Sequence, residues 1–149
     1  MTAKQHVSST LEDYLEAIYH LTAGRGVARS KDIAEAMGVS RASVTGALKA
    51  LSEKELVHYQ PYGYATLTED GQQIAREVVR RHEVLTHFFE DLLGAKASTA
   101  QAAACRAEHI LGPEITARLR AFIEFVAKTR NDGQDIAKQF QQYWEGLSS

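Results

Sequence analysis

Residues 30–49 read SKDIAEAMGVSRASVTGALK, and this stretch has the pattern of a helix-turn-helix. Two short helices that cross at a steep angle need a small residue where they touch, a glycine in the turn and an aliphatic side chain facing inward. Ala34, Gly38 and Val44 meet these needs at successive offsets of four and six. The stretch therefore predicts two packed helices, the second of which keeps one face open to solvent.

Capping residues mark the ends of both helices. Ser30 is predicted to cap the first helix and Ser40 the second, because a serine hydroxyl accepts a hydrogen bond from a free backbone N–H at a helix start. Gly38 is a natural stop for the first helix. The other inward-facing side chains are expected to be Ile33, Met37, Leu48 and Leu51.

The open face of the second helix favours DNA binding, because it offers short polar groups and cations without bulky apolar residues. Such a face can enter a major groove and contact base edges and phosphates. Between Arg25 and Lys49 there are five basic and two acidic residues, although the net charge of the chain is −2. Positive charge is thus expected to be local.

Residues 56–68, LVHYQPYGYATLT, predict a β-hairpin with a Pro-Tyr-Gly turn, which we interpret as the wing of a winged helix. Tyr59, Tyr62 and Tyr64 would lie near its tip. The side chains expected to contact DNA are Arg29, Lys31, Ser40, Arg41, Ser43, Thr45, Gly46, Lys49 and Tyr62.

The remaining sequence predicts helices, so the fold class is mainly α. The predicted domains are an N-terminal winged helix-turn-helix domain over residues 1–77 and an all-helical C-terminal domain over residues 78–149. Outside residues 30–55, a first helix is expected to begin after the cap residues 8–10 and to end near Gly24 and Gly26. Two further helices are expected over residues 68–94 and 96–111, and a last pair on either side of a turn at 131–133.

Composition predicts a cytoplasmic protein without a membrane partner. The chain has 149 residues, 44% of them hydrophobic, which is enough for a compact core. Its single cysteine excludes an intrachain disulfide and fits a reducing compartment. The first residues lack the apolar core of a signal peptide, and no apolar run approaches the roughly 20 residues of a membrane span.

Cys105, Glu108 and His109 form a second pattern, in the segment CRAEHIL. Their spacing of i, i+3 and i+4 puts them on one helical face, where a thiolate, a carboxylate and an imidazole would suit a transition metal. Further ligands would have to come from elsewhere. Asp13 and Glu16 form a similar pair, one helical turn apart.

Each of these residues also has an ordinary explanation. Cys105 alone would be a small buried hydrophobe, His109 a satisfied core histidine, and an acidic pair a solvated helix face.

Two other functions stay open. One is a metal-independent winged-helix regulator that senses a small organic ligand. The other is an enzyme with Cys105 as nucleophile, but nothing in the sequence supplies an orienting group or an oxyanion hole, so we expect no enzyme.

In combination, these segments resemble the family of metalloregulators that includes the manganese transport regulator and the diphtheria toxin repressor. LEDYLEAIYHL, DIAEAMGVSRASVT, RRHEVL and CRAEHIL match that family in order and spacing across nearly the whole chain. The resemblance implies a homodimer that forms through C-terminal helices of a metal-binding and dimerisation domain. It also implies a repressor of metal-uptake genes that binds palindromic double-stranded operator DNA.

The resemblance to the manganese branch of the family also implies a ligand set, in which five of six residue types agree: Asp13, Glu16, His82, Cys105, Glu108 and His109. Cys105 departs, because the manganese branch typically has glutamate there. The iron branch has cysteine at that position, but it usually has methionine at the position of Asp13 and a non-ligand at that of Glu16. The iron branch also carries a third, SH3-like domain, which we do not expect here. The implied cofactor is Mn²⁺ or Fe²⁺. The ligand count slightly favours manganese, while thiolate also suits Co²⁺ and Zn²⁺.

Overall fold

The structure is a computed structural model that describes residues 6–60 and 63–149. The chain divides into two compact units between Val79 and Arg80. The described elements are α1 (Ser9–Arg25), β1 (Ala28–Arg29), α2 (Ser30–Met37), α3 (Arg41–Glu53), β2 (Val57–Gln60), β3 (Tyr64–Leu67), α4 (Glu69–His87), the π-helical turn η1 (Phe88–Leu92), α5 (Ala97–Ala107), α6 (Pro113–Asn131) and α7 (Ile136–Leu147).

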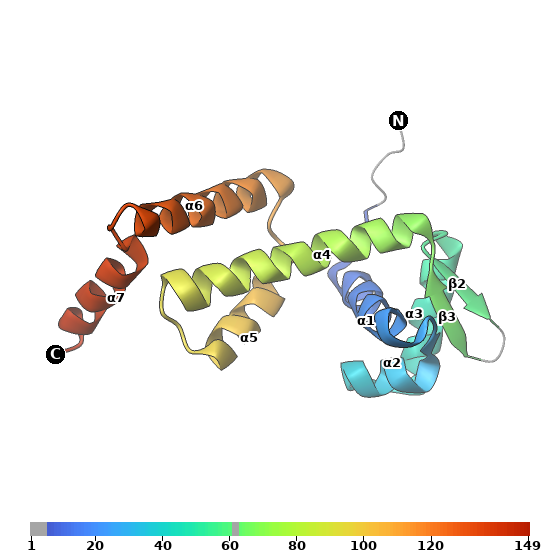
Figure 1. Cartoon of the computed structure of the whole chain (residues 1–149). Helices are drawn as coiled ribbons and strands as arrows, with labels where there is room; N and C mark the ends of the chain where they lie inside the picture. Colours follow the sequence, from blue (N-terminus) through green and yellow to red (C-terminus); the bar gives the residue numbers. More distant parts are fainter. Residues whose placement is uncertain (1–5, 61–62) are drawn as a thin grey trace. The chain divides into compact units, whose positions relative to one another are not determined.

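The N-terminal unit packs three helices and the start of α4 with a small antiparallel sheet (Figure 1). Within the described residues this sheet has the strand order β1-β3-β2. Side chains from all three helices meet in one core, and the largest fully buried ones among them are Leu15, Ile18, Ile33, Leu48 and Leu51. The mainly α winged-helix prediction for this half of the chain is confirmed.

The turn between α2 and α3 has the geometry that the sequence predicts. Gly38 takes a left-handed backbone (φ +66°), which glycine adopts without steric cost, and its N–H donates to the carbonyl of Ala34. The side chain of Ser40 caps α3 by accepting from the N–H of Ser43 at 3.1 Å. Val44 is fully buried, as expected.

The cap predicted for α2 is wrong. Arg29 occupies the N-cap position and its side chain makes no capping bond, while Ser30 is already helical. The hydroxyl of Ser30 donates instead to the carbonyl of Gly63 at 3.3 Å, and its backbone N–H donates to the same oxygen at 2.7 Å. A long-range contact with the wing thus takes the place of the local cap. It also explains β1, a two-residue strand that periodicity cannot detect.

The C-terminal unit is helical, as predicted, and has a smaller core (Figure 1). Its buried side chains are Leu92, Ile123, Val126 and Ala137, with Phe88 packed against them. The sequence predicts an uninterrupted helix to residue 94, but the last turn is π-helical from Phe88 to Leu92. A π turn shifts side chains around the helix axis. Here the turn includes Leu92, which is buried in the core shared with α6 and α7.

The helix expected over residues 96–111 ends early. α5 stops at Ala107, Glu108 is its C-cap, and His109 lies in the following turn. Pro113 explains why no helix continues through Gly112 into α6, since proline disfavours helical backbone in the residue before it and suits the first turn of the next helix. Cys105 and His109 are therefore not on one continuous helix. None of the described helices is long and apolar enough to cross a membrane.

A close backbone approach fixes the junction between the wing and α4. Thr68 accepts a hydrogen bond from the N–H of Gly71 at 3.1 Å and donates one to the carbonyl of Glu55 at 2.8 Å. A Cβ atom at Gly71 would lie 1.9 Å from the carbonyl oxygen of Leu56. Since backbone cannot move aside as a flexible side chain can, this position requires glycine.

We predict that Gly71→Ala lowers the free energy of unfolding by about 1–3 kcal/mol, the usual cost of overpacking. The matched control is Gly24→Ala in α1, where an added Cβ meets nothing within 4 Å. That variant should be as stable as the unmodified protein or slightly more so, because alanine favours helix. Urea unfolding in the presence of a chelator measures both. A Gly71→Ala protein as stable as the control would contradict the contact with Leu56.

Candidate metal centre and DNA-binding surface

A buried carboxylate and an imidazole form the centre of the site in the C-terminal unit. Glu108, at the end of α5, is the buried charged residue of the described core, with 1% of its surface exposed. Its Oε2 atom lies 2.7 Å from Nδ1 of His82 on α4. An ionised carboxylate that leaves water needs a nearby positive charge or hydrogen-bond donors. This pair therefore marks a site that accepts a proton or a cation.

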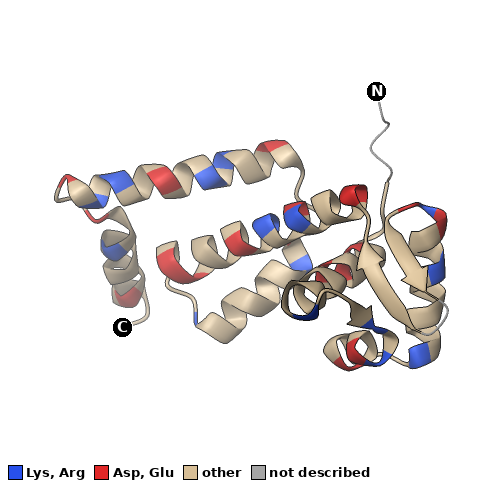
Figure 2. Cartoon of the chain, turned by 45° about the vertical axis from the view of Figure 1, so that its right-hand side comes forward, with Lys and Arg blue, Asp and Glu red and all other residues tan. Residues whose placement is uncertain are grey.

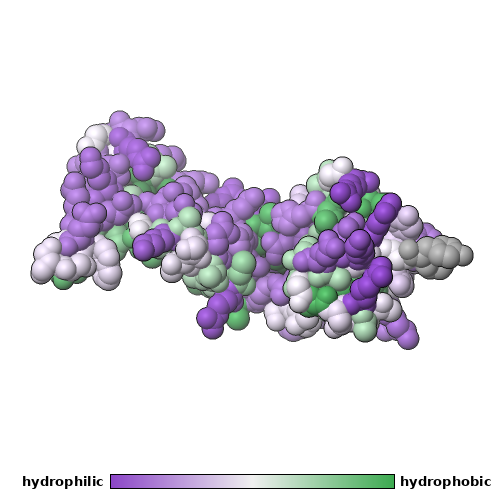
Figure 3. All heavy atoms as spheres, turned by 90° about the horizontal axis from the view of Figure 1, so that it is seen from below, coloured by the Kyte–Doolittle hydropathy of each residue, from purple (hydrophilic) through white to green (hydrophobic). Residues whose placement is uncertain are grey.

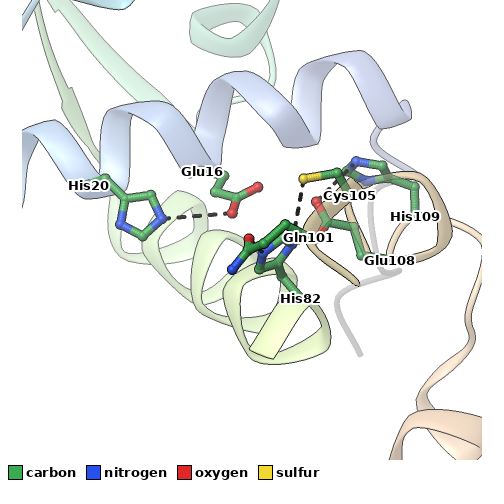
Figure 4. Close-up of polar contacts among 7 residues, drawn as sticks. All are labelled: Glu16, His20, His82, Gln101, Cys105, Glu108 and His109. Carbon is green, nitrogen blue, oxygen red and sulfur yellow. Dashed lines mark hydrogen bonds and ion pairs between the residues drawn. The ribbon is translucent and has the colours of Figure 1, made fainter. Parts of the chain in front are cut away.

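Two more candidate ligands converge on the same pair, and Figure 4 draws them together. The Sγ atom of Cys105 lies 3.8 Å from Nδ1 of His82. Nε2 of His109 lies 3.4 Å from Oε1 of Glu108. Thus the structure brings four of the six predicted ligands together within one unit, although α5 ends before His109. Cys105 is exposed, so the alternative explanation of this residue as a buried hydrophobe is wrong.

Gln101 is a residue of this site that the sequence analysis missed. It lies one helical turn before Cys105 on α5, and its Oε1 is 3.0 Å from Nε2 of His82 (Figure 4). A neutral His82 with its proton on Nε2 would donate to Gln101 and leave Nδ1 free to act as the ligand atom, whereas the 2.7 Å contact of Nδ1 with Oε2 of Glu108 otherwise requires a shared proton. A histidine that binds metal through one nitrogen usually donates from the other to such an acceptor. The i, i+4 spacing from Cys105 was the available signal.

The donor set therefore fits a divalent transition metal. Imidazole nitrogen, carboxylate oxygen and thiolate sulfur all act as acceptors of positive charge, and they point at a common place. Asp13 and Glu16, the other two predicted ligands, belong to α1 of the N-terminal unit, where both are half-buried. Oε1 of Glu16 lies 3.7 Å from Nε2 of His20, one turn further along the same helix.

The predicted DNA contacts of the N-terminal unit are mostly exposed. Arg29 and Lys31 lie at the start of α2, and the other exposed side chains are on α3. The hydroxyl of Ser43 is 2.9 Å from that of Ser40, and Thr45 donates to the carbonyl of Arg41 at 3.0 Å. Tyr62 lies outside the described residues.

The charges of this surface are local. Basic and acidic positions both occur along the whole chain in Figure 2, consistent with a net charge of −2. Arg41 and Lys49 are exposed on α3, and no acidic residue of that helix precedes Glu53. The outer face of α3 can therefore meet a phosphate backbone without local repulsion.

Comparisons with known proteins give one consistent result. Residues 6–65 match the model of the iron-dependent repressor N-terminal DNA-binding domain, and residues 68–138 match that of the iron-dependent repressor metal-binding and dimerisation domain. An HTH-type transcriptional regulator of Methanocaldococcus jannaschii is 34% identical over 119 residues, which cover 79% of this chain and 95% of the relative. The HTH-type transcriptional regulator MntR of Bacillus subtilis is 42% identical over 79 residues, 53% of this chain and 56% of MntR.

Solved structures agree. The manganese regulator SloR has 30% sequence identity and a TM-score of 0.69, with 77% of this chain and 54% of that chain covered. A manganese-dependent transcriptional repressor in complex with manganese has 31% identity and a TM-score of 0.67, with 77% and 53% covered. The chain thus spans about half the length of MntR and of these solved chains.

The winged helix and the His82–Glu108 centre, together with these matches, define a metal-dependent DNA-binding transcriptional regulator. The chain belongs to the iron-dependent repressor family, which includes regulators of the manganese branch. The resemblance stated from the sequence is therefore confirmed.

We predict that Glu108→Gln lowers the affinity for Mn²⁺ and Fe²⁺ at least about tenfold, because it removes a ligand charge at the centre of the donor set. Isothermal titration under anaerobic conditions measures this affinity. Glu124→Gln is the matched control, since that carboxylate is exposed on α6 and pairs with Arg120 at 3.3 Å. Equal metal affinities for the two variants would remove Glu108 from the ligand set.

Proposed function

We propose that this chain is a Mn²⁺- or Fe²⁺-activated repressor of metal-uptake genes that works in the cytoplasm. Residues 1–77 would read DNA, and residues 78–149 would bind metal and dimerise. The observation that carries the proposal is the contact of His82 with buried Glu108, beside Cys105 and His109. This donor set lies in the C-terminal unit, and its centre is the buried charged residue Glu108.

The full ligand set is proposed to combine these four side chains with Asp13 and Glu16. The latter two lie one turn apart on α1, the helix that packs directly on α2 and α3. Ligands from α1 would therefore connect the site mechanically to the recognition helix. When bound, a divalent cation would supply the positive charge that offsets these carboxylates and links the two units.

The choice between manganese and iron depends on Cys105. Three carboxylates and two imidazoles suit Mn²⁺, whereas the thiolate favours softer Fe²⁺, Co²⁺ or Zn²⁺. Known relatives are named for manganese, and the related ScaR has been solved with zinc and with cadmium. We place Mn²⁺ slightly ahead on ligand count, because only one of the six proposed ligands is sulfur.

The proposed switch is a shift between conformations. Without a cation, the clustered carboxylates repel one another and leave the DNA-binding unit free to move. With the ligands engaged, α1 is held, and the two recognition helices of a dimer keep one separation. Palindromic DNA requires that separation to be about one helical turn, ~34 Å, or a multiple of it. The gain in DNA affinity cannot exceed the preference of the cation for that conformation.

DNA contacts are proposed for the start of α2 and the outer face of α3. Ser40 and Ser43 lie at the N-terminus of α3, which in a helix-turn-helix contacts base edges. Gly46 is exposed in the middle of α3 and has nothing near its Cα where a side chain would be. Glycine costs helix stability there, so close approach of DNA is a reason for its presence. Arg41 and Lys49 would bind phosphates.

A homodimer is proposed through α6 and α7, because these helices leave large apolar side chains in solvent. Phe140, Tyr143, Trp144 and Leu147 follow each other at i, i+3, i+4 and i+7 on α7, so they form one stripe, and all are exposed. On α6 the exposed ones are Ile115, Phe122 and Phe125, while Ile123 and Val126 serve the core within the chain. The face drawn in Figure 3 is mainly hydrophilic, with scattered hydrophobic areas, so the apolar stripe is identified from the exposure of its residues. A second copy would cover such a surface.

The decisive experiment is a gel shift with DNA that Mn²⁺-loaded protein selects from a random pool. We expect binding with Mn²⁺ or Fe²⁺, loss of binding with excess chelator, and recovery when metal is restored. Glu108→Gln should lose the response to metal. Arg41→Ala should retain metal affinity but bind DNA more weakly, with a salt dependence reduced by about one phosphate contact.

Undiminished DNA binding in chelator would favour the alternative function, a metal-independent winged-helix regulator that senses a small organic ligand. An enzyme with Cys105 and His109 as a catalytic pair has less support, because His109 lies beyond the end of α5, 3.4 Å from Glu108, and nothing in the sequence supplies an orienting group or an oxyanion hole. Neither alternative explains a buried carboxylate against His82.

Replacement of the thiolate tests the metal preference. Cys105→Glu should shift the ratio of activation by Mn²⁺ and Fe²⁺ toward Mn²⁺, since a carboxylate is the harder ligand. The measurement is half-maximal activation of DNA binding by each metal under anaerobic conditions. Cys105→Ser, which removes the sulfur without adding a carboxylate, is the control. An unchanged ratio in Cys105→Glu would mean that Cys105 is not a ligand.

A further inference from the structure

Arg29 and Tyr64 form an interacting pair of side chains in the N-terminal unit. They are direct neighbours across the antiparallel strands β1 and β3. The guanidinium carbon of Arg29 lies 5.5 Å from the centre of the Tyr64 ring, within the range of a cation–π contact. Arg29 is exposed, and 37% of Tyr64 is exposed, so the cation rests on the ring and stays accessible to solvent.

The backbone around this pair is held in place. Ser30 donates its N–H and its hydroxyl to the carbonyl of Gly63, the residue just before Tyr64. On the other side, Ala28 pairs with Ala65, and both are buried. These contacts fix the register of β1 on β3, so the ring of Tyr64 is held next to Arg29.

The position of Arg29 suits a phosphate contact. It is the N-cap residue of α2, and the first helix of a helix-turn-helix crosses the DNA backbone. A guanidinium binds phosphate with directed N–H donors, but a free arginine side chain loses much rotamer freedom when it does so. A ring that already restricts those rotamers lowers this entropic cost of binding.

We propose that Tyr64 is a positioning residue that holds Arg29 ready for a phosphate of the DNA backbone. This inference rests on the proposed DNA-binding function. The contact carries no sequence information, so Tyr64 affects affinity for any duplex. Tyr59 on β2 is different, because it packs against the core of the N-terminal unit. A tyrosine with only such a packing role would affect the stability of the unit, and its effect on DNA affinity would not depend on Arg29.

A double-mutant cycle on DNA affinity tests the proposal. The full-length protein, loaded with Mn²⁺, is titrated with a random-sequence duplex at several salt concentrations, and fluorescence anisotropy gives Kd. Arg29→Gln should reduce the slope of log affinity against log salt by about one unit. Tyr64→Leu should weaken binding about two- to fivefold, the factor that corresponds to an exposed cation–π contact. Tyr64→Phe keeps the ring and should bind as the unmodified protein does.

The double variant separates positioning from other roles. In the Arg29→Gln background, Tyr64→Leu should have no further effect on Kd. If Tyr64→Leu weakens binding equally with and without Arg29, the tyrosine contacts DNA itself or supports the wing, and the proposal is overturned. A loss of binding in Tyr64→Phe also overturns it, because the hydroxyl would then be the active group. If the unmodified protein binds no duplex, the proposed function fails, and this inference fails with it.

Discussion

The contact between buried Glu108 and His82 is the interaction on which the proposed function of this protein depends. A carboxylate with 1% of its surface exposed is costly unless positive charge or hydrogen bonds compensate it. The end of α5 at Ala107 puts Glu108 at the C-cap, and Gln101 contacts the other nitrogen of His82. The end of α5 and the contact with Gln101 therefore both help to position the proposed ligands. Apolar residues would often be more stable at such a buried place, which supports the proposal that this carboxylate binds a ligand.

The N-terminal unit solves a different problem, which is to present a polar helix face on a fully apolar base. Ile33, Leu48 and Leu51 are completely buried beneath that face. Two contacts also fix the edges of the unit: Ser30 of α2 donates a hydrogen bond to the carbonyl of Gly63 in the wing, and Gly71 lies against the backbone of Leu56. In the proposed switch, a rigid reading surface would transmit a small displacement of α1 as a whole-body movement, which a mechanism based on dimer spacing needs.

Much of the fold follows from local patterns. Gly38, Ser40 and Val44 act in the structure as their spacing predicts, and so does the turn at Gly133, whose φ is +82°. The errors share a physical cause. Ser30 is a strong cap residue locally, but the carbonyl of Gly63, 33 positions away, takes its hydroxyl. The π turn at Phe88–Leu92 likewise follows the demands of a shared core and leaves no mark in helical periodicity.

The sequence by itself determined the residue types of the site and their order, since thiolate, carboxylate and imidazole donors at family spacing favour metal binding. It also determined the helix-turn-helix, because short-range sterics at glycine and small residues act within a few positions. Only the tertiary structure decided that His82 contacts Glu108 through Nδ1, that Gln101 contacts the other nitrogen, and that the Tyr64 ring lies against Arg29. Those contacts join elements far apart in the chain, and their geometry is set by packing, which no local pattern encodes.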